Sequence, residues 1–170
     1  MTGIHGAEVT DPGVRIRAAA PDDVDLTAQV WRAAWLDGHR GRVPDALLAI
    51  REPEYFAAKA AEMVASTLLA VDGSGAIVGV AIVAGDELSQ LAVDREARRV
   101  GTGSSLLAAA EARIAARFDE AWLYVVPDNT GAREFYERHG WIDTGATIYA
   151  APAGDRNVDV PVHRYVKTVR

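Results

Sequence analysis

Two spacings of apolar residues alternate along the chain. Residues 87–93 alternate apolar and polar positions, as in a strand, whereas Leu107, Ala110, Ile114 and Phe118 recur at helical spacing. These patterns predict strands at residues 14–18, 67–71, 76–84, 87–93, 121–126, 142–150 and 158–168. They predict helices between residue 21 and a loop at 37–44, at 45–50 and 54–65, from the turn at 100–104 to residue 118, and at 130–139.

The expected order of elements is β-α-α-β-β-β-α-β-α-β-β, which indicates a mixed α/β fold. The chain of 170 residues suits a single domain, expected at residues 13–170 after a disordered tail at 1–12. On the strand at 87–93, simple alternation places the residues on two faces: Leu88, Gln90 and Ala92 on one, and Glu87, Ser89, Leu91 and Val93 on the other.

Composition narrows the function classes. The chain has no cysteine, which excludes disulfides, thiolate metal sites and a cysteine nucleophile. The absence of a long apolar run and of a secretion signal leads us to expect a cytoplasmic protein without a membrane partner. A net charge of −6 disfavours a nucleic-acid partner and is compatible with a cationic acceptor, although solubility alone also accounts for mild acidity.

A basic, glycine-containing turn lies between the strand at 87–93 and the next helix. Gly101 and Gly103 let backbone N–H groups converge just before the helix, where free donors and the helix dipole suit a phosphate. A dinucleotide fingerprint fits this turn poorly because its third small position holds Leu106. A P-loop does not fit either, because no glycine here is followed by the lysine that this motif requires. A simple strand-to-helix connection remains the alternative interpretation of this turn.

Two segments carry a family resemblance. Residues 98–103 match R/Q-x-x-G-x-G/A, and residues 129–141 match N-x-x-A-x-x-F-Y-x-x-x-G-F/W. In this order and spacing they resemble the GNAT superfamily of acetyl-CoA-dependent N-acetyltransferases. The resemblance extends over about residues 14–170 and implies a mixed sheet of about seven strands, parted at the acetyl-CoA site, with about four helices. It implies acetyl-CoA as co-substrate and no metal.

The resemblance assigns the coenzyme contacts. Backbone groups of the central strand are expected to pair with the pantetheine arm like an added strand, and the N–H of Val93 or its neighbour would polarise the thioester carbonyl. The turn is expected to bind the pyrophosphate, with Arg133 as a further phosphate neighbour or, more simply, a helix-surface partner of Glu137. The expected coenzyme-binding residues are Leu91, Ala92, Val93, Arg98, Arg99, Val100, Gly101, Thr102, Gly103, Ser104 and Asn129.

Two residues are the candidates for proton transfer. Tyr136 corresponds to the family tyrosine that protonates the leaving thiolate, because a phenol with a pKa of about 10 stays protonated beside a thiol of about 8.5. Glu87 occupies the position of the catalytic glutamate in the histone-acetylating branch and is the candidate base. The alternative for Tyr136 is an aromatic residue of the core, and the alternative for Glu87 is a solvated carboxylate at the end of a strand. His39 and His163 are weaker candidates for the base.

The acceptor pocket of the family is lined by the first two helices and their loop. Trp31, Trp35, His39 and Tyr124 are therefore the expected acceptor-binding residues, although the helical spacing of the two tryptophans equally indicates core packing. Arg40 and Arg42 suggest an acceptor with a carboxylate or phosphate, and a solvated loop explains them equally well.

The function expected from these residues is acetyl transfer from acetyl-CoA to a primary amine of a small molecule or a peptide. Without cysteine or a G-x-S-x-G elbow, direct attack in a ternary complex is the simpler route. The alternatives are a coenzyme-binding regulatory domain without turnover and transfer to an aminoacyl-tRNA, which the net charge disfavours. The sequence allows a homodimer and leaves open the acceptor and the acyl group.

Overall fold

The computed structural model describes residues 13–170, and the tail expected at residues 1–12 lies outside them. Within the described chain, one seven-stranded sheet has the order β1-β2-β3-β4-β5-β7-β6, accompanied by five α-helices. The strands are β1 Val14–Ala18, β2 Thr67–Asp72, β3 Ile77–Ala84, β4 Glu87–Val93, β5 Glu120–Val125, β6 Ile142–Ala153 and β7 Arg156–Thr168. The helices are α1 Val24–His39, α2 Asp45–Ile50, α3 Pro53–Glu62, α4 Thr102–Ala115 and α5 Thr130–Arg138. The predicted mixed α/β sheet is confirmed.

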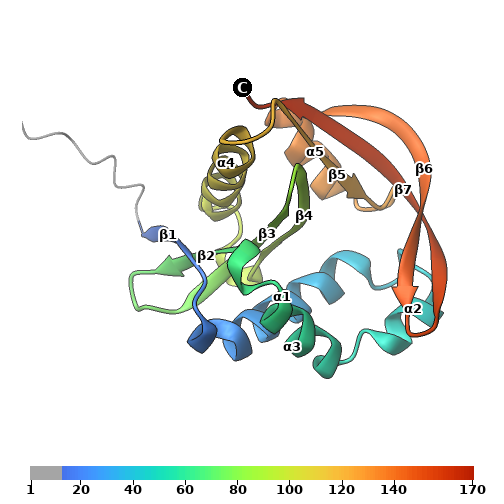
Figure 1. Cartoon of the computed structure of the whole chain (residues 1–170), viewed down its shortest axis with the longest axis horizontal. Coiled ribbons are helices and arrows are strands. Elements are labelled where there is room, and N and C mark those ends of the chain that lie inside the picture. The colour runs from blue at the N-terminus through green and yellow to red at the C-terminus, as the bar shows by residue number, and fades with distance from the viewer. Residues whose placement is uncertain (1–12) are drawn as a thin grey trace, which may run out of the picture.

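Helices cover both faces of the sheet (Figure 1). The α1-side core gathers Trp31, Phe56 and alternate residues of β3 such as Val80 and Ile82. The α4-side core gathers the other β3 residues, Ala81 and Val83, against α4 and α5. The continuous apolar run of β3 follows from this burial on two faces.

Helix α4 packs closely on β3 at Gly79. A Cβ at this position would lie 2.6 Å from Leu106 Cδ1 and 3.2 Å from the Cβ of Ala70. The missing side chain therefore leaves room for Leu106, which is fully buried.

A bulge in β4 changes its predicted faces. Gln90 pairs with Ile82 but Leu88 pairs with Val83, so Ser89 is an extra residue in the ladder. Leu88 consequently packs in the α4-side core with Leu91 and Val93 rather than sharing a face with Gln90 and Ala92. The simple alternation predicted for residues 87–93 is wrong at this point, because one inserted residue moves the preceding side chain to the other face.

The sheet parts between β4 and β5. The two strands pair in parallel at Glu87 and Trp122, and the Trp122 N–H donates to the Asp86 carbonyl at 3.1 Å. Beyond this point β5 keeps its pairing with β7, while β4 keeps its pairing with β3. The predicted opening in the sheet is therefore present.

Strands β6 and β7 form a long curved hairpin whose far end lies beside α2 (Figure 1). The predicted loop at 151–155 is reduced to a turn after Ala153. Two contacts attach the far end of the hairpin to the rest of the domain. Ala151 is fully buried in the α1-side core, and Arg51 donates to the Pro152 carbonyl at 3.0 Å. No helix within residues 13–170 is long and apolar enough to span a membrane.

Helix α1 runs to His39, beyond the start of the loop predicted at 37–44. The Arg42 guanidinium donates to the carbonyls of Asp37, at 3.3 Å, and Gly38, at 3.0 Å. A basic side chain at these terminal carbonyls stabilises the last turn, which sequence spacing alone does not reveal.

Candidate active site

A cleft passes through the sheet where β4 and β5 part. Leu88 and Leu123 line it from the α4-side core, and Val43 and Val160 line it from the α1-side core. Because these two cores lie on opposite faces of the sheet, the cleft connects them. It encloses about 910 Å³, its open mouth included.

The exposed edge of β4 borders this cleft. The Asp94 N–H donates to the Val78 carbonyl on β3 at 2.8 Å. In an antiparallel ladder alternate residues bond to the same neighbour, so the main-chain groups of Leu91 and Val93 point toward the gap. Ala92, predicted with them, occupies the alternate position, so its main-chain groups face β3, where it lies opposite Val80.

The glycine turn has the backbone that a helix-terminal anion site needs. Gly101 is the N-cap of α4 in the left-handed conformation, with φ +90°, and Arg99 also has a positive φ of 65°. A Cβ at Gly103 would touch the Phe135 ring at 3.5 Å, so α5 closes on this turn. Thr102 Oγ1 is buried without a hydrogen-bond partner in the described structure.

Hydrogen bonds connect the turn to α5. The Ser104 hydroxyl lies 2.9 Å from His139 Nε2, and His139 Nδ1 lies 2.7 Å from the Phe135 carbonyl. Since a carbonyl only accepts, Nδ1 carries the proton and Nε2 accepts from Ser104. His139, whose role here sequence reasoning missed, thus fixes the start of α4 against the end of α5.

An acidic residue on α1 contacts the basic part of the turn. Arg98 Nη2 lies 3.3 Å from Asp37 Oδ2, and Arg95 Nη2 lies 2.8 Å from Asp37 Oδ1. Arg98 Nε also donates to the Val93 carbonyl at 3.0 Å. Asp37 was not predicted, because only the fold brings α1 beside this turn.

Asn129 lies where three elements meet at the cleft. Its Oδ1 accepts the Ala132 N–H at 3.3 Å and thereby caps α5. Its Nδ2 faces the end of α1, since a Cβ at Gly38 would lie 3.4 Å from that nitrogen. Asn129 is among the residues that line the cleft.

Tyr136 lines the cleft from the α4-side core and is 8% exposed. Its ring packs against Trp141, with centroids 5.9 Å apart, and against Tyr165 at 6.4 Å. Burial raises the pKa of the Tyr136 phenol far above its ordinary value. The hydroxyl is therefore protonated near neutral pH.

Glu87 lies at the point where the strands part, and it also lines the cleft. Desolvation raises the pKa of its carboxyl, and the neighbouring charge of Asp86 raises this pKa further. A carboxylate in this state is a stronger base than an exposed glutamate. Glu87 and Tyr136 are thus both brought to the same cleft.

The predicted acceptor residues divide between wall and core. Tyr124 and His39 line the cleft, whereas Trp31 and Trp35 lie in the α1-side core, 5% and 8% exposed. Trp31 faces the sheet, because its indole donates to Gln90 Oε1 at 3.2 Å. Trp35 stacks on His39 of the same helix, with centroids 4.4 Å apart, and contacts Phe56 of α3 at 5.9 Å. Burial lowers the pKa of His39, so its ring is neutral near pH 7.

Three other predicted residues have structural contacts. The Arg133 guanidinium donates to the Tyr165 hydroxyl at 3.0 Å and to Asp143 at 3.1 Å, rather than pairing with Glu137. His163 Nδ1 lies 2.8 Å from the same Asp143. Arg42 bonds to the end of α1, as described above, and Arg40 is exposed. None of these side chains is among the residues that line the cleft.

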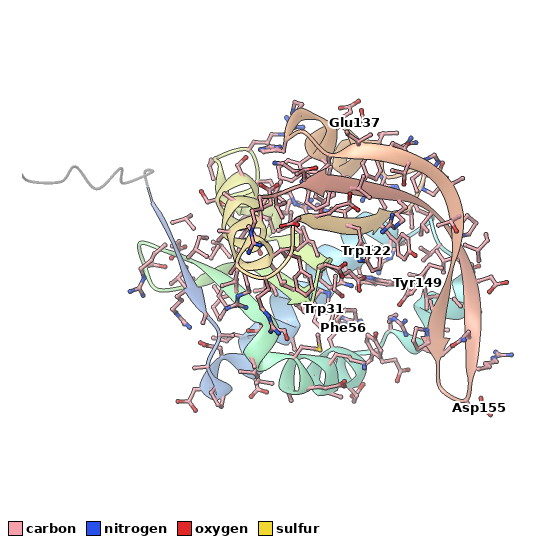
Figure 2. All side chains as sticks on the ribbon, turned by 45° about the horizontal axis from the view of Figure 1, so that its top comes forward. Trp31, Phe56, Trp122, Glu137, Tyr149 and Asp155 are labelled. Atoms are coloured by element: carbon pink, nitrogen blue, oxygen red, sulfur yellow. The ribbon has the colours of Figure 1, made fainter. Side chains whose placement is uncertain are left out.

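The hairpin adds an aromatic residue that sequence reasoning missed. Tyr149 on β6, labelled in Figure 2, lines the cleft. Its ring centroid is 5.7 Å from that of Tyr124. The apolar and polar residues of β6 do not alternate regularly, so nothing in the sequence indicates that Tyr149 contacts Tyr124. Within residues 13–170, no cluster of His, Cys, Asp and Glu has the arrangement of a metal site.

Comparison with known proteins agrees with this geometry. A sequence profile of the acetyltransferase (GNAT) domain matches residues 47–152, and no curated protein matches the chain. The fold is similar to a GCN5-related N-acetyltransferase from Rhodopseudomonas palustris, with 22% identity and a TM-score of 0.71 over 91% of this chain and 94% of that one.

Two further similar structures contain the coenzyme. One is the PaiA N-acetyltransferase of Thermoplasma acidophilum in complex with coenzyme A, with 18% identity and a TM-score of 0.68 over 91% of this chain and 98% of that one. The other is a phosphinothricin acetyltransferase of Sinorhizobium meliloti in complex with acetyl-CoA, with 16% identity and a TM-score of 0.68 over 91% of this chain and 88% of that one. Because the matched domain covers more than half of its length, this chain belongs to the GNAT family of acetyltransferases.

Proposed function

We propose that the protein is an acetyl-CoA-dependent N-acetyltransferase that acts on a primary amine by direct attack in a ternary complex. The observation that carries the proposal is the cleft itself. It connects the two faces of a parted sheet, with Tyr136 on the α4 side and Glu87 where the strands separate. Co-substrate and acceptor would therefore approach the same point from opposite sides.

The residues fit a coenzyme with a diphosphate and an amide-bearing arm. Unpaired N–H groups at the start of α4, the left-handed Gly101 and the unpartnered Thr102 hydroxyl would bind the phosphates. The main-chain groups of Leu91 and Val93 would bind the arm as an added strand, and Asn129 would contact it from α5. When bound, acetyl-CoA supplies the thioester that carries the acetyl group.

Tyr136 and Glu87 would divide the proton transfers. An alkylamine has a pKa of about 10.4 and is mostly protonated near pH 7. Glu87, whose pKa is raised by burial, would accept the ammonium proton, directly or through water. Tyr136, whose phenol stays protonated, would donate a proton to the departing sulfur.

Replacing Tyr136 with Phe tests this assignment. The ring and its packing are kept, so coenzyme A should bind as in the wild type while kcat falls by about 10²- to 10⁴-fold. Tyr165→Phe is the matched control: Tyr165 is fully buried in the same core, but its hydroxyl bonds to Glu137 and Arg133. This control should lose stability and retain kcat. A Tyr136→Phe protein with wild-type kcat would contradict the assignment of Tyr136. A wild-type protein that binds the coenzyme but transfers acetyl to no amine would instead be a regulatory domain.

A further inference from the structure

We infer that the acceptor is a primary amine with an aromatic or apolar body and no anionic group. This inference rests on the proposed function and names the substrate class of the same cleft. It follows from the residues on the α1 side of the cleft, which is the face of the sheet opposite α4.

Four aliphatic residues line the α1 side of the cleft, beside the polar His39 and Gln90. The aliphatic residues, all of them buried, are Val43, Leu47, Val160 and Val162. They come from the segment before α2, from α2 and from the β7 arm of the hairpin. An acceptor that fills this space exchanges water contacts for aliphatic ones, which favours an apolar body over a polar one.

Aromatic rings form another wall. The centroids of Tyr124 and Tyr149 lie 5.7 Å apart with their planes inclined at 37°, and Trp122 adds an edge contact to Tyr124 at 4.9 Å. In Figure 2, Tyr149 points from the hairpin toward the body of the molecule. Such rings suit both an aromatic acceptor and the ammonium group of an amine.

The charges in the cleft are of one sign. Of the residues within 13–170 that line it, Glu87 is the only carboxyl and none is Arg or Lys, and His39 is neutral near pH 7. An ammonium group entering the cleft is attracted by Glu87. A carboxylate on the acceptor would meet Glu87 at short range, and such like-charge approach is unfavourable. The cations whose charges act on His39 or Tyr149 are Arg42, Arg51 and Lys59, and their side chains are not among the residues that line the cleft.

Two arginines near these aromatic residues are held outside the wall. Arg51 stacks over the Tyr55 ring at 4.0 Å and donates to the Pro152 carbonyl. Arg164 lies over the Trp122 ring at 5.3 Å. Neither is among the residues that line the cleft. The anionic acceptor that Arg40 and Arg42 suggested in the sequence therefore finds no cation on this wall.

Matched pairs of an amine and its α-amino acid test the inference. Tyramine and tyrosine share the aromatic body and the amino group, and only tyrosine carries a carboxylate. We expect kcat/KM for tyramine to exceed that for tyrosine by about 100-fold or more, which corresponds to about 2.7 kcal/mol. Binding of each compound to the protein saturated with coenzyme A, measured by calorimetry, provides the same comparison without turnover.

Variants on β6 test the role of charge. Tyr149→Arg places a cation on the wall and should reduce the preference for tyramine by about tenfold or more. Ile148→Arg is the matched control: Ile148 is the adjacent residue, 56% exposed, and successive residues of a strand face opposite ways, so the preference should persist.

The outcomes separate the inference from the proposed function. Equal or better use of tyrosine, or binding of neither compound to the coenzyme complex, would overturn the inference. Preferential binding of tyramine without any acetyl transfer would support the acceptor class and contradict the proposed catalytic function.

Discussion

The backbone of the glycine turn gives a quantitative test of the coenzyme site. Gly101 has φ +90° and ψ −1° at the N-cap of α4, a conformation that costs an alanine about 1–2 kcal/mol. Gly101→Ala divides this cost between folding and binding. Strain that remains in the free protein lowers the melting temperature, by about 2–8 °C if all of it remains. A free turn that relaxes to negative φ keeps its stability, and binding of coenzyme A must then restore the strained backbone. We expect the Kd for coenzyme A to rise by up to about 5- to 30-fold.

Gly75→Ala is the matched control for this experiment. Gly75 has φ +88°, almost the same as Gly101, and a Cβ there meets no atom within 4 Å. It lies in the turn between β2 and β3, outside the residues that line the cleft. The control should show a similar loss of stability by thermal unfolding and an unchanged Kd by calorimetry. Equal coenzyme affinity in both variants, together with a smaller loss of stability for Gly101→Ala than for Gly75→Ala, would refute the account of the turn.

Three further predictions concern packing and pH. Gly79→Ala should destabilise the protein by about 1–3 kcal/mol in urea unfolding, because the new Cβ would lie 2.6 Å from Leu106 Cδ1; an unchanged midpoint would contradict this packing. Because the pKa of Glu87 is raised, wild-type activity should already fall with decreasing pH above the ordinary glutamate range, which gives the pH profile an acidic limb. Glu87→Gln should lower kcat/KM by about 10²-fold and remove this acidic limb. A variant that retains the limb would exclude Glu87 as its origin. Arg17 lowers the pKa of Asp23 to about 2, so this pair stabilises the fold above pH 3.8 and loses its effect as pH falls toward 2. Asp23→Asn should therefore reduce the free energy of unfolding by about 1 kcal/mol at pH 7, allowing for solvent screening, and by nothing near pH 2. An equal reduction at both pH values would point to another cause.

Local signals in the sequence were sufficient for the elements and for the glycine turn. The helical spacing of α4 and the alternation of β4 depend on neighbours in the chain, and the left-handed N-cap requires a residue such as Gly101. The bulge at Ser89 left no such signal. It is a property of the pairing between β3 and β4, and pairing partners are not encoded in a single strand.

Contacts across the fold explain the parts of the site that could not be predicted. Tyr149 reaches Tyr124 only because the hairpin curves toward α2, and Asp37 reaches Arg98 only because α1 ends beside the turn. Trp31 and Trp35 show the opposite case. Their spacing marks a buried helix face whether it borders a cleft or a core, and only the packing of α1 on the sheet assigns them to the core.

Transfer of a labelled acetyl group tests the central claim most directly. The wild-type protein is incubated with acetyl-CoA labelled in the acetyl group and with tyramine, and the products are separated and identified by mass spectrometry. The account predicts label on the amine nitrogen at a rate that depends on Tyr136, with no labelled protein. Tight binding of coenzyme A with all label remaining on the thioester, across tyramine and a panel of other primary amines, would contradict it.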